Sequence, residues 1–163
     1  MYTVDRHDRV EELTDLPHQS TGAPVPLLLA EDGELILAYL VESEADEVAV
    51  VEFESVRAHY FGPPNDEALN GHPLYQKGLR FYRVYEVQNS SWIRALERMN
   101  RVHPKHQSGM FSRYRHFIFT FHDTTLECVA NGIRKVTRLP YVDRASLLAD
   151  MRQRLPDNIV SRI

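Results

Sequence analysis

The sequence predicts an α+β fold in which a mainly antiparallel sheet is combined with two or three helices in a single domain, residues 1–163. Three observations favour this class: an Asp-Gly turn between two apolar segments, further apolar-rich strand segments, and two capped helical segments in the second half. The chain has 163 residues, of which 43% are hydrophobic, so it is large enough to bury one core without disulfides or a structural metal.

The first half of the chain is predicted to form strands. Residues 26–30 and 34–42 are apolar and flank Asp32-Gly33, a dipeptide typical of β-hairpin turns. Residues 47–54 form the next strand, and residues 56–61 extend or follow it. Acidic residues between these segments suit solvated turns and sheet edges, where charge also discourages aggregation.

Residues 61–78 are predicted to form a long loop, because the glycine and proline residues within it oppose regular structure. Leu69, Leu74 and Tyr75 give this loop apolar anchors, so we expect it to be ordered and packed. Two interpretations remain open: the loop lines a functional site, or it is a connection held by these anchors. The second interpretation is favoured, since most such loops are connections.

The second half mixes strands and helices. An aromatic-rich strand is expected over residues 79–87, followed by a helix over residues 92–102 that Asn89-Ser90-Ser91 caps. Residues 115–122 and 125–133 form a hairpin. A final helix begins after Asp143, reaches about Leu155 and ends at Pro156.

This hairpin has two different faces, because side chains alternate along a strand. Phe117, Phe119 and Phe121 share the apolar face, and a two-residue turn at Asp123-Thr124 places Phe119 opposite Cys128. We therefore expect Cys128 to be buried. A thiol packed against phenylalanine rings has a raised pKa and is a poor nucleophile.

The polar face of the hairpin carries the candidate catalytic residues His122 and Glu127. In the same register Thr120 lies opposite Glu127, and His122 lies diagonal to it within reach of its carboxylate. A His/Glu couple suits a general base with an orienting group, and it equally suits an ordinary cross-strand hydrogen bond, which is favoured. The candidate binding residues are His59, His72, Tyr75 and Thr120.

The eight histidines raise the question of a metal site. His116 and His122 are six strand residues apart, roughly 20 Å, so they cannot ligate one ion. His103 and His106 flank a proline after the helix and share no helical face. A site that combines His59 or His72 with the hairpin stays open, but the sequence contains no zinc signature, and no metal or cofactor is expected.

Charge is divided unevenly along the chain. Residues 10–56 contain twelve acidic residues and no Lys or Arg, whereas residues 57–163 contain seventeen basic and nine acidic residues. Such a division fits intramolecular pairing, a homodimer, or capture of an acidic or protein partner. The basic side chains near Trp92, from Arg94 to Arg115, also suit nucleic acid, but a pI of about 6.0 and the lack of a recognition motif make nucleic acid an unfavoured partner.

No apolar run approaches the roughly 20 residues that a membrane span needs, and the polar N-terminal residues do not form a secretory signal. Cys128, the single cysteine, cannot form an internal disulfide. A cytoplasmic protein without membrane contact is therefore expected.

Three segments resemble a family of bacterial proteins of unknown function: Phe61 to Leu74 with its Phe-Gly-Pro-Pro-Asn-Asp-Glu-Ala and Gly-His-Pro-Leu motifs, Glu86 to Ile93, and Arg115 to Cys128. The resemblance covers roughly the second half of the chain and implies a bacterial cytoplasmic setting. The leading hypothesis for function is a non-catalytic binding or interaction protein. The main alternative is a small hydrolase-like enzyme centred on His122 and Glu127, with a metal completed by His59 or His72, and nucleic-acid binding is the lesser alternative.

Overall fold

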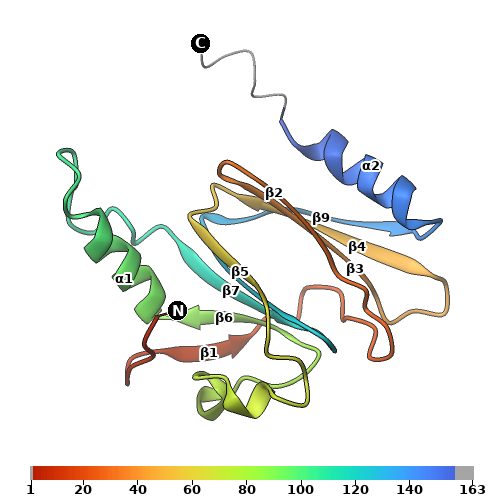
Figure 1. Ribbon diagram of the computed structural model, residues 1–163, viewed down its shortest axis with the longest axis horizontal. Helices are drawn as coiled ribbons and strands as arrows, with labels where there is room; N and C mark the ends of the chain where they lie inside the picture. The colour runs from red at the N-terminus through yellow and green to blue at the C-terminus, as the bar shows by residue number, and fades with distance from the viewer. Residues whose placement is uncertain (1, 157–163) are drawn as a thin grey trace.

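The computed structural model describes residues 2–156 and confirms the α+β class: two antiparallel sheets pack face to face, with one helix against the outer face of each (Figure 1). The five-stranded sheet has the order β1-β6-β7-β8-β5, and the four-stranded sheet has the order β2-β3-β4-β9. The elements are β1 (Arg9–Glu12), β2 (Leu27–Glu31), β3 (Glu34–Leu40), β4 (Glu47–Glu54), β5 (Ala58–Gly62), β6 (Val84–Gln88), α1 (Ser91–Asn100), β7 (Arg115–Thr120), β8 (Thr125–Ala130), β9 (Gly132–Pro140) and α2 (Arg144–Arg154).

Aromatic side chains fill the space between the two sheets. Tyr39 of β3 lies 6.1 Å from Phe119 of β7, and Phe53 of β4 lies 5.8 Å from Phe117, measured between ring centroids. Cys128 is fully buried in the same core, as predicted, and burial raises its pKa. The inner faces of both sheets are therefore committed to packing, and polar chemistry is confined to the outer faces.

The β7–β8 hairpin turns at His122-Asp123, one residue before the predicted turn, so the predicted register is wrong by two residues. Phe117 rather than Phe119 lies opposite Cys128. A shift by an even number of residues leaves every side chain on its own face, which is why the predicted apolar face is still correct. Hydrophobic pattern alone is equally compatible with both registers.

The corrected register changes the polar outer face. Glu127 lies opposite Ile118 instead of Thr120. The histidine diagonal to Glu127 is accordingly His116, which comes six residues before His122 in the chain.

The chain changes sheet at three points: between β1 and β2, between β4 and β5, and between β8 and β9. β4 passes into β5 through Ser55, which has a positive φ of 50°, and β8 passes into β9 next to Asn131, whose N–H donates to the carbonyl of Glu54. The strand predicted over residues 125–133 is therefore two strands in different sheets. The structure also contains β1, which was not expected, and β6 begins at Val84 instead of near residue 79.

Other local predictions are confirmed. The β2–β3 hairpin turns at Asp32-Gly33, Ser90 caps α1, and Asp143 caps α2 by accepting a hydrogen bond from the N–H of Ser146. Buried Leu147 and Met151 of α2 pack on the outer face of the four-stranded sheet.

The outer face of the five-stranded sheet is covered by α1 and by the loop between β5 and β6. The loop contains two short 3-10 helices, Leu69–Gly71 and Tyr75–Lys77, and buries Leu69 and Leu74 against Ile118. The loop is thus ordered and packed as predicted, and it holds its polar side chains over the sheet.

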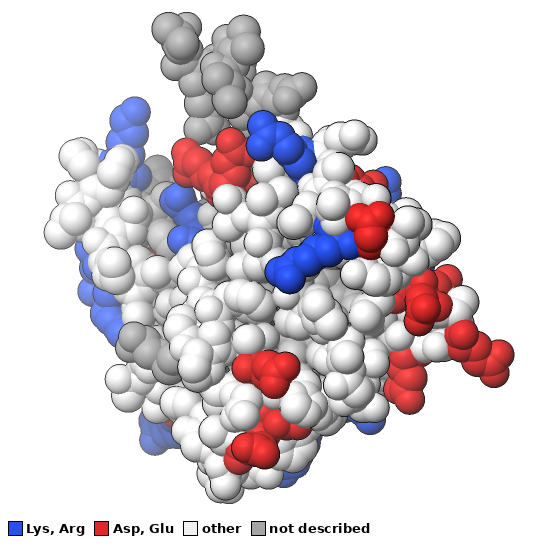
Figure 2. All heavy atoms as spheres, turned by 45° about the vertical axis from the view of Figure 1, so that its right-hand side comes forward, with Lys and Arg blue, Asp and Glu red and all other residues white. Residues whose placement is uncertain are grey.

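Some acidic residues of the first part of the chain form ion pairs with basic residues of the second part. Acidic side chains of β3 and β4 form ion pairs with basic side chains of β9 and α2: Glu34 with Arg134, Glu47 with Arg138, and Glu52 with Arg154. Other acidic side chains remain grouped on the right of the face shown in Figure 2. Within residues 2–156, no helix has the length and apolar character needed to cross a membrane.

Candidate functional site: a buried carboxylate beside an aromatic cavity

Glu127 is the centre of a hydrogen-bond network on the outer face of the five-stranded sheet. Its side chain is 2% exposed. Oε1 lies 3.1 Å from Nε2 of His72, and Oε2 lies 3.0 Å from Nε2 of His116 and accepts a 2.6 Å hydrogen bond from the hydroxyl of Tyr2. One carboxylate thus joins four segments that are far apart in the sequence.

Each partner of Glu127 is positioned by a different element. His72 follows the first 3-10 helix of the packed loop, and His116 is held on β7 by the sheet register. Tyr2 stacks on Trp92 of α1, with ring centroids 5.2 Å apart, and both rings meet His116 edge-on. The polar network is therefore enclosed by aromatic rings, which exclude water from it.

The hydrogen bonds determine where the imidazole protons lie. The N–H of Leu74 donates to Nδ1 of His72, so the proton of this ring is on Nε2 and points to Glu127. The hydroxyl of Ser90, which accepts from the N–H of Ile93, can donate to Nδ1 of His116, 2.9 Å away. In this arrangement each histidine directs its Nε2 proton to Glu127.

Glu127 is accordingly an anion stabilised by three donors. Burial raises its pKa, but the hydrogen bonds to His116 and His72 and the charge interactions with these two residues outweigh this effect and lower the pKa from its ordinary 4.5 to about 2. For Tyr2, burial and the charge of Glu127 raise the pKa, so its phenol stays protonated and donates. The site therefore holds an ionised carboxylate at neutral pH.

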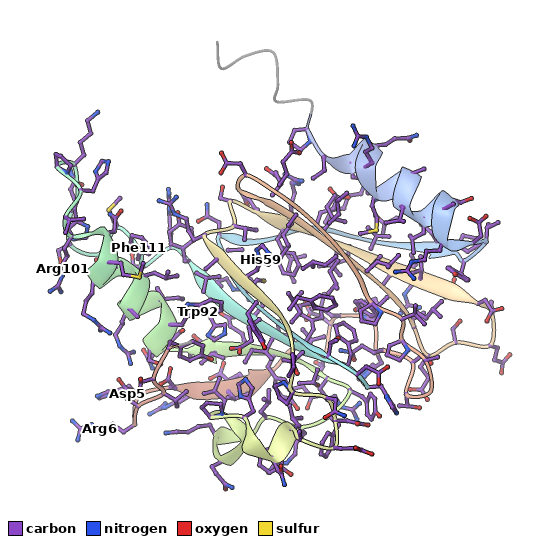
Figure 3. All side chains as sticks on the ribbon, in the orientation of Figure 1. Asp5, Arg6, His59, Trp92, Arg101 and Phe111 are labelled. Carbon is purple, nitrogen blue, oxygen red and sulfur yellow. The ribbon has the colours of Figure 1, made fainter. Side chains whose placement is uncertain are left out.

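A cavity of about 440 Å³ opens beside this carboxylate. Its lining combines Glu127 and His59 with the rings of Tyr2, Tyr60 and Trp92 and with apolar side chains of α1, including Leu96 and Met99. Figure 3 shows Trp92 on the side of α1 that faces the sheet, with His59 on β5 across from it. The cavity is therefore apolar and aromatic, with one carboxylate in its lining.

The predicted pairing of His122 with Glu127 is wrong. Nδ1 of His122 lies 2.9 Å from Asp123, and Nε2 lies 3.9 Å from Asp66 at an exposed position near the end of the sheet. The hydrogen bond to Asp123 and the charge of Asp66 raise the pKa of His122. The two-residue register shift explains the error, because it moves His122 from the strand into the turn.

The four predicted binding residues are separated in the structure. His72 contacts Glu127 and His59 lines the cavity. The hydroxyl of Thr120 instead bonds to backbone atoms of Arg80 and Arg83, and the ring of Tyr75 lies under the guanidinium of Arg80. Thr120 and Tyr75 therefore have structural contacts outside the cavity.

The sequence interpretation did not assign His116, Tyr2 or Trp92 to the site. A signal for His116 was present, because it shares the polar face of the hairpin with Thr120, and the correct turn would have placed it diagonal to Glu127. Tyr2 lies 125 residues from Glu127, and no spacing rule links the two.

The order Ser90–His116–Glu127 matches that of a nucleophile, a base and an orienting carboxylate. Two contacts oppose such a role. The Ser90 oxygen already caps α1, and the adjacent N–H of Ser91, which could have stabilised an oxyanion, donates to Oδ1 of Asp8 at 2.6 Å. An aspartate at that position disfavours developing negative charge. These two contacts therefore argue against Ser90 as a nucleophile.

The histidines do not converge on a metal site within residues 2–156. No group of three His, Cys, Asp or Glu side chains in this part of the chain is arranged to hold an ion. His72 and His122 in particular face different carboxylates.

Comparisons with known proteins gave no match, whether to a family model, to a curated protein or to a solved structure. Function has to be inferred from Glu127 and the cavity beside it.

Proposed function

We propose that the protein is a non-catalytic binding protein whose cavity holds a small amphipathic ligand with a cationic group directed at Glu127. The observation that carries this proposal is an ionised, buried carboxylate in the lining of an aromatic cavity. Cavities of this size, mostly apolar with few polar groups, are typical of small-molecule sites.

The charge of the site selects the charge of the ligand. A carboxylate has about four acceptor positions, and Tyr2, His72 and His116 use three of them, which leaves one on Oε1. An ammonium group fits this position, and the rings of Tyr60 and Trp92 add cation–π attraction of about 0.5–2 kcal/mol. An anionic ligand would meet repulsion from Glu127 instead.

The side chains of α1 supply the apolar contact. Met99 is 72% exposed although it lines the cavity, and Leu96 lies one turn earlier on the same helix face. Methionine adapts to irregular apolar surfaces. An apolar ligand chain bound here would cover the side chain of Met99, which is otherwise exposed to water.

Two observations favour binding over the hydrolase-like alternative. A carboxylate with a pKa of about 2 that is held by three donors is a weak general base at neutral pH. The serine in contact with His116 caps a helix beside Asp8. For the nucleic-acid alternative, Arg94 and Arg115 are engaged with Asp5 and Glu86.

Trp92 is the only tryptophan, so its fluorescence reports on the cavity. We expect octylammonium to change this fluorescence saturably, octanol to bind more weakly, and octanoate to bind least. Equal binding of octanoate and octylammonium, or no saturable response to any of the three, would refute the proposal.

A variant that fills the cavity tests the location of binding. Ala95 lines the cavity but takes no part in the Glu127 network, so Ala95→Phe should abolish binding of octylammonium and leave the fold intact. Ala149→Phe makes the same change on an exposed face of α2 and should leave binding unchanged. Binding that survives in Ala95→Phe would place the ligand elsewhere.

A further inference from the structure

We infer that the ligand is a zwitterion with a linear apolar body, whose anionic end is held by Arg57; this inference rests on the proposed function and specifies the ligand class of the same cavity. The evidence is a second hollow, of about 280 Å³, lined by Arg57, Leu96, Met99, Asn100 and Phe111. Leu96 and Met99 line both spaces, so the two hollows adjoin along α1, and we treat them as one groove.

Arg57 is presented for recognition in this hollow. Its guanidinium carbon lies 5.8 Å from the ring centroids of both Phe111 and Tyr114, which orient the charge. The ion pairs within residues 2–156 use other arginines, and none of them includes Arg57. A planar guanidinium free of a carboxylate partner is suited to bind one from a ligand.

The sheet register gives the backbone spacing between the two ends of the site. Tyr60 lies opposite Glu127, and the N–H of Arg57 donates to the carbonyl of Val129. Arg57 and Tyr60 are three residues apart on an extended segment, so their Cα atoms lie roughly 10 Å apart. Taking this backbone distance as the scale of the ligand, on the order of 10 Å between ammonium and carboxylate, leads to an ω-amino acid with about eight carbons.

The groove explains this ligand class better than a simple cation. Glu127 attracts the ammonium group at the buried end, Leu96 and Met99 cover the apolar chain, and Arg57 neutralises the carboxylate at the open end. The two protein charges oppose each other in sign, so a ligand in the reverse orientation meets repulsion at both ends. The groove is thus specific for direction as well as for charge.

The test compares 8-aminooctanoate with octylammonium by Trp92 fluorescence. An ion pair at an exposed site contributes up to about 1 kcal/mol, so 8-aminooctanoate should bind up to about five-fold more tightly. The advantage should shrink as salt rises. The shorter 5-aminopentanoate cannot span both charges and should bind no more tightly than pentylammonium.

Arg57→Gln should remove the advantage of 8-aminooctanoate over octylammonium, measured on the same variant. Arg98→Gln is the matched control, because it removes an equal charge from an exposed position on α1 outside both hollows, and it should preserve the advantage. If octylammonium binds but 8-aminooctanoate gains nothing, or if the gain survives in Arg57→Gln, the zwitterion inference is overturned while the proposed function stands. Failure of octylammonium itself would overturn both.

Discussion

Replacement of Glu127 by Gln tests whether this residue is a buried anion that folding stabilises. The amide can keep its oxygen toward His72, whose Nδ1 is fixed as an acceptor by Leu74. Its NH2 group then faces His116, which can accept on Nε2 if its proton moves to Nδ1 and toward Ser90. The hydroxyl of Tyr2 donates to the same carboxylate oxygen, so it loses its acceptor when the NH2 group takes that place. The variant therefore removes the charge and one hydrogen bond, and the pH dependence of its stability isolates the effect of the charge.

The magnitude follows from the pKa of Glu127. Folding lowers this pKa from 4.5 to about 2, so the carboxylate contributes stability above pH 4.5 and loses that contribution as the pH falls through 2. At 1.36 kcal/mol for each pKa unit, the contribution is about 3 kcal/mol at pH 7 and about 1.5 kcal/mol at pH 3. The free energies of unfolding of the wild type and Glu127→Gln should converge toward low pH by this difference.

Urea unfolding at several pH values between 7 and 3 measures this convergence. Asp5, Asp66 and Asp143 also have lowered pKa values, but they are present in both proteins and cancel in the difference. Glu11→Gln, a change at an exposed carboxylate, should give a gap near zero at every pH. A gap for Glu127→Gln that stays constant from pH 7 to pH 3 would show that Glu127 is not an anion stabilised on folding.

Three further predictions concern the scaffold. Cys128→Ser should lower the free energy of unfolding by about 1–3 kcal/mol because a hydroxyl is buried, and the wild-type thiol should react with thiol reagents only on unfolding; rapid labelling of the native protein would contradict its burial. Arg154→Met should cost about 1.5–3 kcal/mol in urea unfolding, because it breaks the hydrogen bond to buried Glu52 that ties α2 to the sheet; an unchanged midpoint would show that the apolar contacts suffice. Ser90→Ala should cost about 1–3 kcal/mol through loss of the helix cap and of the donor to His116, and nitrogen NMR should detect a shifted Nδ1 resonance of His116 because its hydrogen bond is lost; an unchanged Nδ1 resonance would show that Ser90 does not donate to it.

Local signals were sufficient for the elements that carry their own turn or cap chemistry. Asp32-Gly33 supplies the left-handed backbone that a tight hairpin needs, and φ of Gly33 is 81°. Asp143 supplies an oxygen to the first free N–H groups of α2. These features depend on neighbours in the sequence, so a sequence pattern can identify them.

Non-local pairing was beyond the reach of the same signals. Strand β9 is mostly exposed and carries Arg134, Lys135 and Arg138, so it lacks the apolar pattern of a core strand and is stabilised by pairing with β4. In the β7–β8 hairpin, two registers satisfy the apolar face equally. The backbone hydrogen bond between Phe121 and Thr124 fixes the turn at His122-Asp123, and with it the register of the polar face.

The candidate site depends on this non-local geometry more than the fold does. Glu127 was identified from the polar face of the hairpin, and His72 from the loop that crosses it, but their contact depends on how Leu69 and Leu74 pack on Ile118. No rule of spacing connects residues that lie 55 positions apart. The apolar residues of the loop indicate that it packs against the protein. Only the structure shows that it packs on Ile118 and so brings His72 to Glu127.

A buried carboxylate is seldom required for stability, since well-packed apolar residues of similar volume often replace buried charged groups without loss. At Glu127 the protein instead commits Tyr2, His72 and His116 to one anion, and each of these donors would be left unsatisfied without it. Glu127 also lies in the lining of a cavity, beside the exposed side chain of Met99, and this position is what supports the proposed recognition of a positively charged ligand in addition to its contribution to folding.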